Sequence, residues 1–94
     1  MIEKVQLQDR VVQVSGCVTA DVAGDMVVSN VETGCYVGLN PTAQAIWNLM
    51  SEPVAVGGLC EILCARYAVD AAVCEAQVLQ TLDRLLDQGL IRRD

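Results

Sequence analysis

The sequence contains no histidine, the side chain that proteins use most often as a general base near neutral pH. Without it, neither a Cys–His nor a Ser–His nucleophile pair can be assembled within the chain. A phosphate-binding loop is also missing, because Gly57 and Gly58 have neither the spacing nor the lysine of that motif. We therefore predict no catalytic residues and expect a protein that is not an enzyme.

Paired metal-ligand spacing is missing as well. The five cysteines include no C-x-x-C pair; they are Cys17, Cys35, Cys60, Cys64 and Cys74. Cys60 and Cys64 lie one helical turn apart and could supply two ligands, but a closed zinc site needs two more. We expect no metal and no cofactor, and interpret the cysteines as small buried side chains in a reducing compartment.

Basic residues are scarce: six Lys and Arg stand against twelve Asp and Glu, which gives a formal net charge of −6. Nucleic-acid-binding proteins gain much of their affinity by neutralising phosphates, so this balance disfavours a nucleic-acid partner. No window approaches the ~18 consecutive apolar residues of a membrane span. We expect a soluble, cytoplasmic protein with no membrane association.

Hydrophobic residues make up 53% of the 94 residues, which is enough for a packed fold. Only three are aromatic (Tyr36, Trp47 and Tyr67), so the core must be built from aliphatic side chains and cysteine. At this length we expect one domain, spanning residues 1–94, with a single core.

The first forty residues have the composition of strands. Residues 11–14 are rich in β-branched side chains, and residues 26–31 and 35–39 read as a second and a third strand. The short connection between the last two contains Gly34, which supplies the positive φ that a tight hairpin needs. We predict a three-stranded antiparallel sheet with the second strand in the centre.

From Asn40 onward the hydrophobic period changes from two to 3.6. Asn40 can cap a helix that begins at Pro41, and the sequence around Pro53 stops it. A second helix is expected to run to about Tyr67. Asp70 then caps a third helix that ends at Gly89. The predicted class is α+β, a three-stranded antiparallel sheet followed by a three-helix, winged-helix-like bundle.

The third helix carries more apolar surface than a small bundle needs. Val78, Leu82 and Leu85 form one stripe, and Ala72, Leu79 and Leu86 form a second stripe beside it. The second stripe either belongs to the core or borders a groove next to the sheet, and the sequence leaves both readings open. Glu75 lies between the stripes, as a solvated first-turn acid or as a ligand for a basic side chain.

The third strand would lie at a sheet edge without the usual protection. Residues 35–39 contain no charge and no proline, the features that discourage another strand from pairing there. Either a helix covers this edge, or it receives an extended peptide as an added strand. The same edge leaves open a homodimer.

The segment from Asn30 to Ala43, N-V-E-T-G-C-Y-V-G-L-N-P-T-A, resembles the signature of PqqD-like domains. The resemblance continues through A-I-W-N-L-M at residues 45–50, R-Y-A-V-D at 66–70 and the end of the third helix, and so covers roughly residues 10–91. The chain departs from the family at residues 55–58, where a Thr-hydrophobic-Glu-like opening is common, and at Gln77, where many members are acidic. These departures bear on which leader is accepted.

The resemblance implies a recognition element for ribosomally made, post-translationally modified peptides. Such domains bind the leader of a precursor peptide between the third strand and the third helix, and present it to a modifying enzyme or leader peptidase. The sequence at residues 39–42 and 46–47 is closer to that of the stand-alone proteins of lasso-peptide biosynthesis. The peptide-binding residues that we predict on this basis are Cys35, Tyr36, Val37, Gly38, Leu39, Ala72, Glu75, Ala76, Leu79, Asp83 and Leu86.

Two alternatives remain at this stage. A winged-helix DNA-binding regulator would share the three-helix topology, and an antitoxin or enzyme subunit is not excluded by the sequence. The regulator would need basic residues on its third helix, where Arg84 stands against Glu75, Asp83 and Asp87.

We therefore predict no measurable affinity for duplex DNA near physiological salt, because acidic side chains on the third helix would repel phosphates. An electrophoretic mobility shift at micromolar protein tests this. A shift that weakens as salt is raised would instead support the winged-helix regulator.

Overall fold

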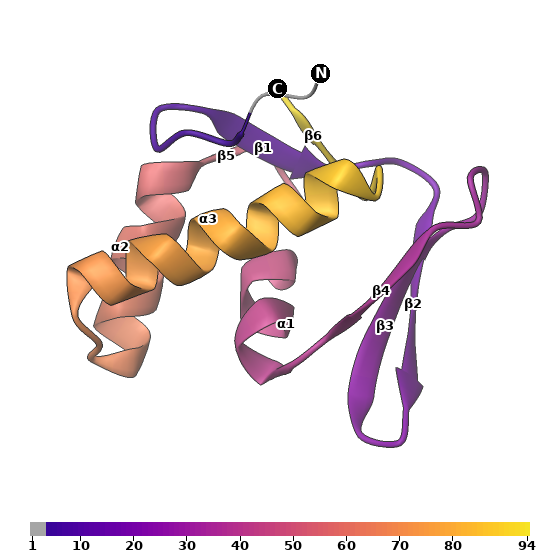
Figure 1. The fold of residues 1–94 in the computed structure, drawn as a ribbon, viewed down its shortest axis with the longest axis horizontal. Coiled ribbons are helices and arrows are strands. Elements are labelled where there is room, and N and C mark those ends of the chain that lie inside the picture. Colours follow the sequence, from indigo (N-terminus) through magenta and orange to yellow (C-terminus); the bar gives the residue numbers. More distant parts are fainter. Residues whose placement is uncertain (1–3) are drawn as a thin grey trace.

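The computed structural model describes residues 4–94, which form three helices and two small sheets (Figure 1). The elements in chain order are β1 (Arg10–Gln13), β2 (Cys17–Val22), β3 (Asp25–Asn30), β4 (Tyr36–Leu39), α1 (Pro41–Asn48), β5 (Val54–Ala55), α2 (Val56–Tyr67), α3 (Ala71–Asp87) and β6 (Ile91–Arg93).

One sheet is the antiparallel meander β2-β3-β4, with β3 in the centre. Val28 of β3 pairs with Val37 of β4, and both side chains are buried against the helices. The predicted second and third strands are thus confirmed, as is the central place of the second. The predicted first strand is wrong for this sheet: its place is taken by β2, from the segment that follows Gly16.

The predicted first strand instead forms β1, the centre of a second sheet with order β5-β1-β6. Val11 of β1 pairs with Val54 of β5 and with Arg93 of β6. Local β propensity predicts that β1 is a strand, but it does not predict which sheet β1 joins, because its partners β5 and β6 are distant in the sequence. Leu90 and Ile91 at β6 are buried, so the chain does pack back after Gly89 as expected.

The helix ends agree with the expected capping residues. The Asn40 side chain accepts a hydrogen bond from the Ala43 N–H at 2.9 Å, and Asp70 accepts one from the Ala72 N–H at 2.8 Å. Gly89, with φ of +73°, follows the last turn of α3. The predicted starts of α1 and α3 and the predicted end of α3 are confirmed.

The start of α2 depends on the N-terminal segment, residues 4–9, rather than on a side-chain cap. The Gly57 N–H donates to the Leu7 carbonyl at 3.1 Å, and the Val56 N–H donates to the Asp9 carbonyl at 2.9 Å. A Cβ on Gly57 would lie 3.6 Å from the Leu7 oxygen, in ordinary contact. The close approach of the two backbones therefore does not require a glycine at this position.

The overall class is α+β, with three helices and a three-stranded antiparallel sheet as predicted, and with the second sheet as an addition. The winged-helix-like description stays a prediction. Across residues 4–94, no helix combines the length and apolarity that crossing a membrane would require.

Asn30 ties the meander to the helical part of the molecule. It is a polar residue with only 4% exposure, at the end of β3. Its Nδ2 donates to the Gly89 carbonyl at 3.0 Å, and its Oδ1 accepts from the N–H groups of Glu32 and Thr33 at 2.9 and 3.4 Å. The side-chain amide of Asn30 thus provides hydrogen bonds both to N–H groups of the turn before β4 and to the carbonyl group of Gly89, which follows α3.

We expect Asn30→Asp to lower the free energy of unfolding by about 1–3 kcal/mol, since the Gly89 carbonyl loses its donor and faces a carboxylate. Urea denaturation followed by circular dichroism measures the change. Val31→Ala, at an exposed neighbouring position, is the matched control and should differ from the wild type by under about 0.5 kcal/mol. Equal effects from both changes would contradict the role assigned to Asn30.

Candidate functional site

The outer edge of β4 is open in this fold. β4 is the last strand of the meander, with β3 on one side and no described strand on the other. The Asn30 N–H donates to the Cys35 carbonyl, and backbone groups along an antiparallel strand alternate in direction. Residues 35, 37 and 39 therefore face β3 with their backbone groups, whereas Tyr36 and Gly38 direct theirs to the open edge.

β4 is anchored to the core by two buried side chains, and its outer edge is accessible. Val37 and Leu39 are buried in the core, which fixes the strand against the helices. Tyr36 is 70% exposed, and the Gly38 position has space for a Cβ with no atom within 4 Å. The edge therefore presents unpaired backbone groups on a strand that is anchored to the core. Pairing with an extended peptide requires such unpaired groups.

The C-terminal turn of α3 forms the other wall of a cavity of about 300 Å³ at this strand. The wall on the strand side is made by Tyr36, Val37 and Gly38, and the wall on the helix side by Arg84, Asp87 and Gln88. A hollow therefore separates β4 from the C-terminal turn of α3, and its use as a peptide-binding cleft stays a prediction.

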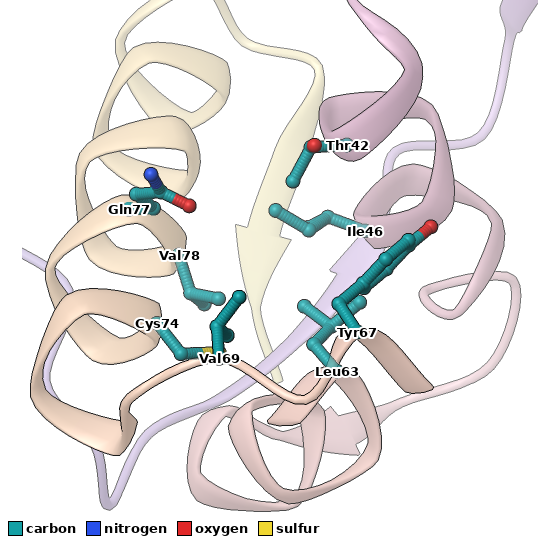
Figure 2. A pocket seen from close by; sticks show the side chains of 8 residues that line it. All are labelled: Thr42, Ile46, Leu63, Tyr67, Val69, Cys74, Gln77 and Val78. Atoms are coloured by element: carbon teal, nitrogen blue, oxygen red, sulfur yellow. The ribbon is translucent and has the colours of Figure 1, made fainter. Parts of the chain in front are cut away.

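Two further cavities continue from this one along the same flank of α3. A polar cavity of about 300 Å³ shares Arg84 with the first and is lined by Asn40, Thr42, Gln77, Gln80, Thr81 and Arg84. An apolar pocket of about 260 Å³ shares Thr42 and Gln77 with the second and is lined in addition by Ile46, Leu63, Tyr67, Val69, Cys74 and Val78 (Figure 2). We call this series of three cavities the α3 groove.

The structure brings together only part of the predicted site. Tyr36, Val37 and Gly38 line the groove, and Cys35 and Leu39 flank them on the same strand segment. The predicted α3 residues do not line it; they are Ala72, Glu75, Ala76, Leu79, Asp83 and Leu86. Leu79 and Leu86 each lie about 100° around the helix from their neighbours Gln80 and Asp87, and about 160° from Gln77 and Arg84, which all line the groove.

The second apolar stripe of α3 lies on the side of the helix where the N-terminal segment contacts Asp83. Leu79 and Leu86 are half-buried and pack against the core, of which Val5 is a member with 3% exposure. The Val5 N–H donates to the Asp83 carboxylate at 2.8 Å. Glu75 faces the same side, where it lines a cavity together with Leu7. Leu79 and Leu86 therefore belong to the margin of the core, whereas Ala72, the third member of the stripe, is exposed.

The N-terminal segment is itself anchored on two sides. Asp9 Oδ2 accepts hydrogen bonds from the Gln6 N–H at 2.9 Å and from Arg93 Nε at 3.2 Å. The Gln6 hydrogen bond, with a smaller effect of Arg93, lowers the pKa of Asp9 below its usual range. Val5 is thereby held beside Asp83 of α3.

Sequence reasoning missed the polar residues of α3 that line the groove. Gln77, Thr81, Arg84 and Gln88 recur at the spacing of a helix face, next to the buried stripe of Val78, Leu82 and Leu85. This periodicity was visible in the sequence, but a polar stripe is also what an ordinary solvent-facing helix presents.

Three of the five cysteines have thiols with little nucleophilic character. Burial raises the pKa of the thiols of Cys17, Cys60 and Cys74, the last to about 11, with the neighbouring Cys64 adding to the shift. Thiols with raised pKa values stay protonated near neutral pH and are poor nucleophiles. Within residues 4–94, no group of three or more Cys, Asp or Glu is placed to hold a metal ion.

Two comparisons relate this geometry to known proteins. Residues 25–91, from the start of β3 to the start of β6, match the profile of the family described as coenzyme PQQ synthesis protein D (PqqD). The fold is similar to that of TbiB1, solved in complex with the TbiA(β) leader peptide, with a TM-score of 0.74 and 26% sequence identity. The similarity covers 86% of this chain and 94% of TbiB1. No curated protein matches the chain.

The placement of the second stripe of α3 predicts different outcomes for adjacent residues. Leu79→Glu should lower the free energy of unfolding by about 1–3 kcal/mol, because it places a carboxylate against the core. Gln80→Glu, which adds the same charge on the exposed flank, should change it by under about 0.5 kcal/mol. Thermal and urea unfolding of both variants measure the difference. A Leu79→Glu protein as stable as the wild type would contradict coverage by the N-terminal segment.

Proposed function

This chain belongs to the PqqD family, and on that premise we propose that it binds the leader segment of a ribosomally made precursor peptide. The observation that carries the proposal is the open edge of β4 beside the α3 groove. An exposed strand with a cavity along it offers both backbone hydrogen bonds and side-chain contacts to an extended chain.

The leader adds to the meander as a fourth strand next to β4. Its backbone pairs with the N–H and C=O groups of Tyr36 and Gly38, which face the open edge. Because side chains alternate along a strand, every second leader residue points toward the wall of α3. The backbone ladder supplies affinity for any extended peptide, and the residues along α3 select among sequences.

The wall that selects is formed by Gln77, Gln80, Thr81, Arg84 and Gln88 rather than by the stripe of Leu79. Residues 35–39 keep their peptide-binding role, whereas the peptide-binding face of α3 lies nearly half a turn around the helix from the predicted one. Support comes from the cavity lining and from the contact between Asp83 and Val5.

In this role the chain presents its peptide to a separate modifying enzyme or leader peptidase, and acts in the cytoplasm without catalysing a reaction itself. The lasso-peptide type is the assignment that we favour. The absence of histidine and the protonated state of the buried thiols are consistent with a binding function. TbiB1, which is similar in fold, was solved with a leader peptide bound.

A proline at Gly38 provides the most direct test of strand addition. Gly38→Pro removes an N–H that faces the open edge, and leaves intact the Val37 groups that pair with β3. We expect affinity for a bound leader peptide to fall at least about tenfold, equivalent to about 1.4 kcal/mol. Gly38→Ala keeps the N–H, its Cβ meets no neighbour, and it should bind like the wild type.

The measurement uses peptides selected from a displayed library of random linear sequences, titrated by fluorescence anisotropy. Melting curves of both variants establish that each is folded. Peptides that bind Gly38→Pro and Gly38→Ala equally well would exclude the edge of β4 as the site. A library that yields no binder to the wild type would overturn the proposed function.

Arg84 gives a second, electrostatic test. It is the only basic residue lining the two cavities nearest β4, in a protein with a net charge of −6. Arg84→Glu should weaken a leader that carries an acidic residue near its centre, and the loss should shrink as salt is raised. Arg66→Glu, a charge reversal at the end of α2, is the control. Equal losses from the two substitutions would indicate a general charge effect instead of a local contact.

A further inference from the structure

Three of the five cysteines lie together where α2 packs against α3. Cys60 and Cys64 are one turn apart on α2, and Cys74 is in the first turn of α3. The other two, Cys17 and Cys35, belong to the meander and its last turn, away from this group. All five are free thiols in this structure. Pairing of a peptide with the edge of β4 gives this grouping no role.

The Cys74 thiol is placed between the two cysteines of α2. Its Sγ donates to the Cys60 carbonyl oxygen at 3.6 Å. In an α-helix the carbonyl of residue 60 accepts a hydrogen bond from the N–H of residue 64, so this oxygen lies between the two turns that carry Cys60 and Cys64. A side-chain hydrogen bond also joins the thiols of Cys64 and Cys74. The sulfur atoms of these two residues are therefore in contact across the helix interface.

The two thiols differ in their access to solvent. Cys74 is only 3% exposed, whereas Cys64 is half-buried and lines a cavity of about 400 Å³. Two other residues that line this cavity, Glu61 of α2 and Ala71 of α3, are exposed. A small molecule that enters the cavity therefore meets the Cys64 thiol first, and the Cys74 thiol lies behind it.

We propose that Cys64 and Cys74 form a redox-active pair, which a peroxide converts into an intramolecular disulfide. The Cys64 sulfur attacks one oxygen of hydrogen peroxide, the O–O bond breaks, and the thiol proton leaves with the other oxygen as water. The Cys74 sulfur then attacks the sulfur of this sulfenic acid, the S–O bond breaks, and the Cys74 proton leaves with the hydroxyl group as a second water. Both sulfur atoms are oxidised, and the peroxide is reduced to water.

Contact between the two thiols favours the second step, although the pKa of Cys74 is raised to about 11 and little thiolate is present. The attacking sulfur already lies against its target, so no approach of separate groups is needed. A reducing compartment would keep the pair as thiols until peroxide appears. The bond would tie the last turns of α2 to the first turn of α3. This inference is independent of the proposed function, because neither thiol belongs to β4.

The test treats the folded 94-residue chain with a small molar excess of hydrogen peroxide, then denatures it and alkylates it with N-ethylmaleimide. The reduced chain offers five thiols, and we expect the mass of the oxidised chain to show two fewer adducts. Trypsin cleaves after Arg66 and Arg84, so the bond should join the fragment that ends at Arg66 to residues 67–84. Tandem mass spectrometry of the joined fragments identifies both cysteines. The melting temperature should rise by at least about 5 °C, because the bond restricts the unfolded chain.

Cys60→Ser is the matched control, because it removes the thiol next to the pair and should form the same disulfide as the wild type. Cys64→Ser keeps Cys60 and Cys74 and should form none. Circular dichroism establishes that both variants are folded. A bond that forms in Cys64→Ser as fast as in the wild type would identify Cys60 as the partner and refute the proposal. A wild-type chain that keeps all its thiols, a bond to Cys17 or Cys35, or an oxidised protein that melts below the reduced one would also refute it.

Discussion

The packing of α3 is the constraint on which the rest of the molecule depends. One stripe of the helix, centred on Val78 and Leu82, is buried in the core, and each flank of that stripe faces a different neighbour. On one flank, Leu79 and Leu86 pack against the core, and the N-terminal segment is joined to the helix at Asp83. The other flank is polar and lies along the α3 groove. Coverage on one side and polarity on the other are what leave a groove beside β4 instead of a closed core.

Much of the fold followed from local chemistry in the sequence. Asn40 and Pro41 mark the start of α1, Asp70 marks the start of α3, and Gly89 marks its end, because each residue satisfies or omits a backbone group that a helix terminus leaves unpaired. The hairpin of β3 and β4 was likewise predictable from its turn. The role of β1 was not, since its partners β5 and β6 are distant in sequence and too short to carry a signal of their own.

The candidate site was predictable to a similar extent. The open edge of β4 followed from strand order and from the lack of charge and proline in residues 35–39. The helical half did not follow, because the periodicity of α3 gives the angle between its stripes but not which stripe faces the sheet. That choice is made by Val5 and Asp9, in a segment with little periodicity, whose contacts with α3 and β6 are all long-range.

The pairing of β1 with β6 has a practical consequence for how this chain can be joined to other proteins. The Asp94 N–H donates to the Arg10 carbonyl at 2.9 Å, so the last residue lies beside the start of β1. In Figure 1 this junction lies above α3, whereas α1 and β4 lie below it. A domain fused after residue 94 would thus leave the groove unobstructed.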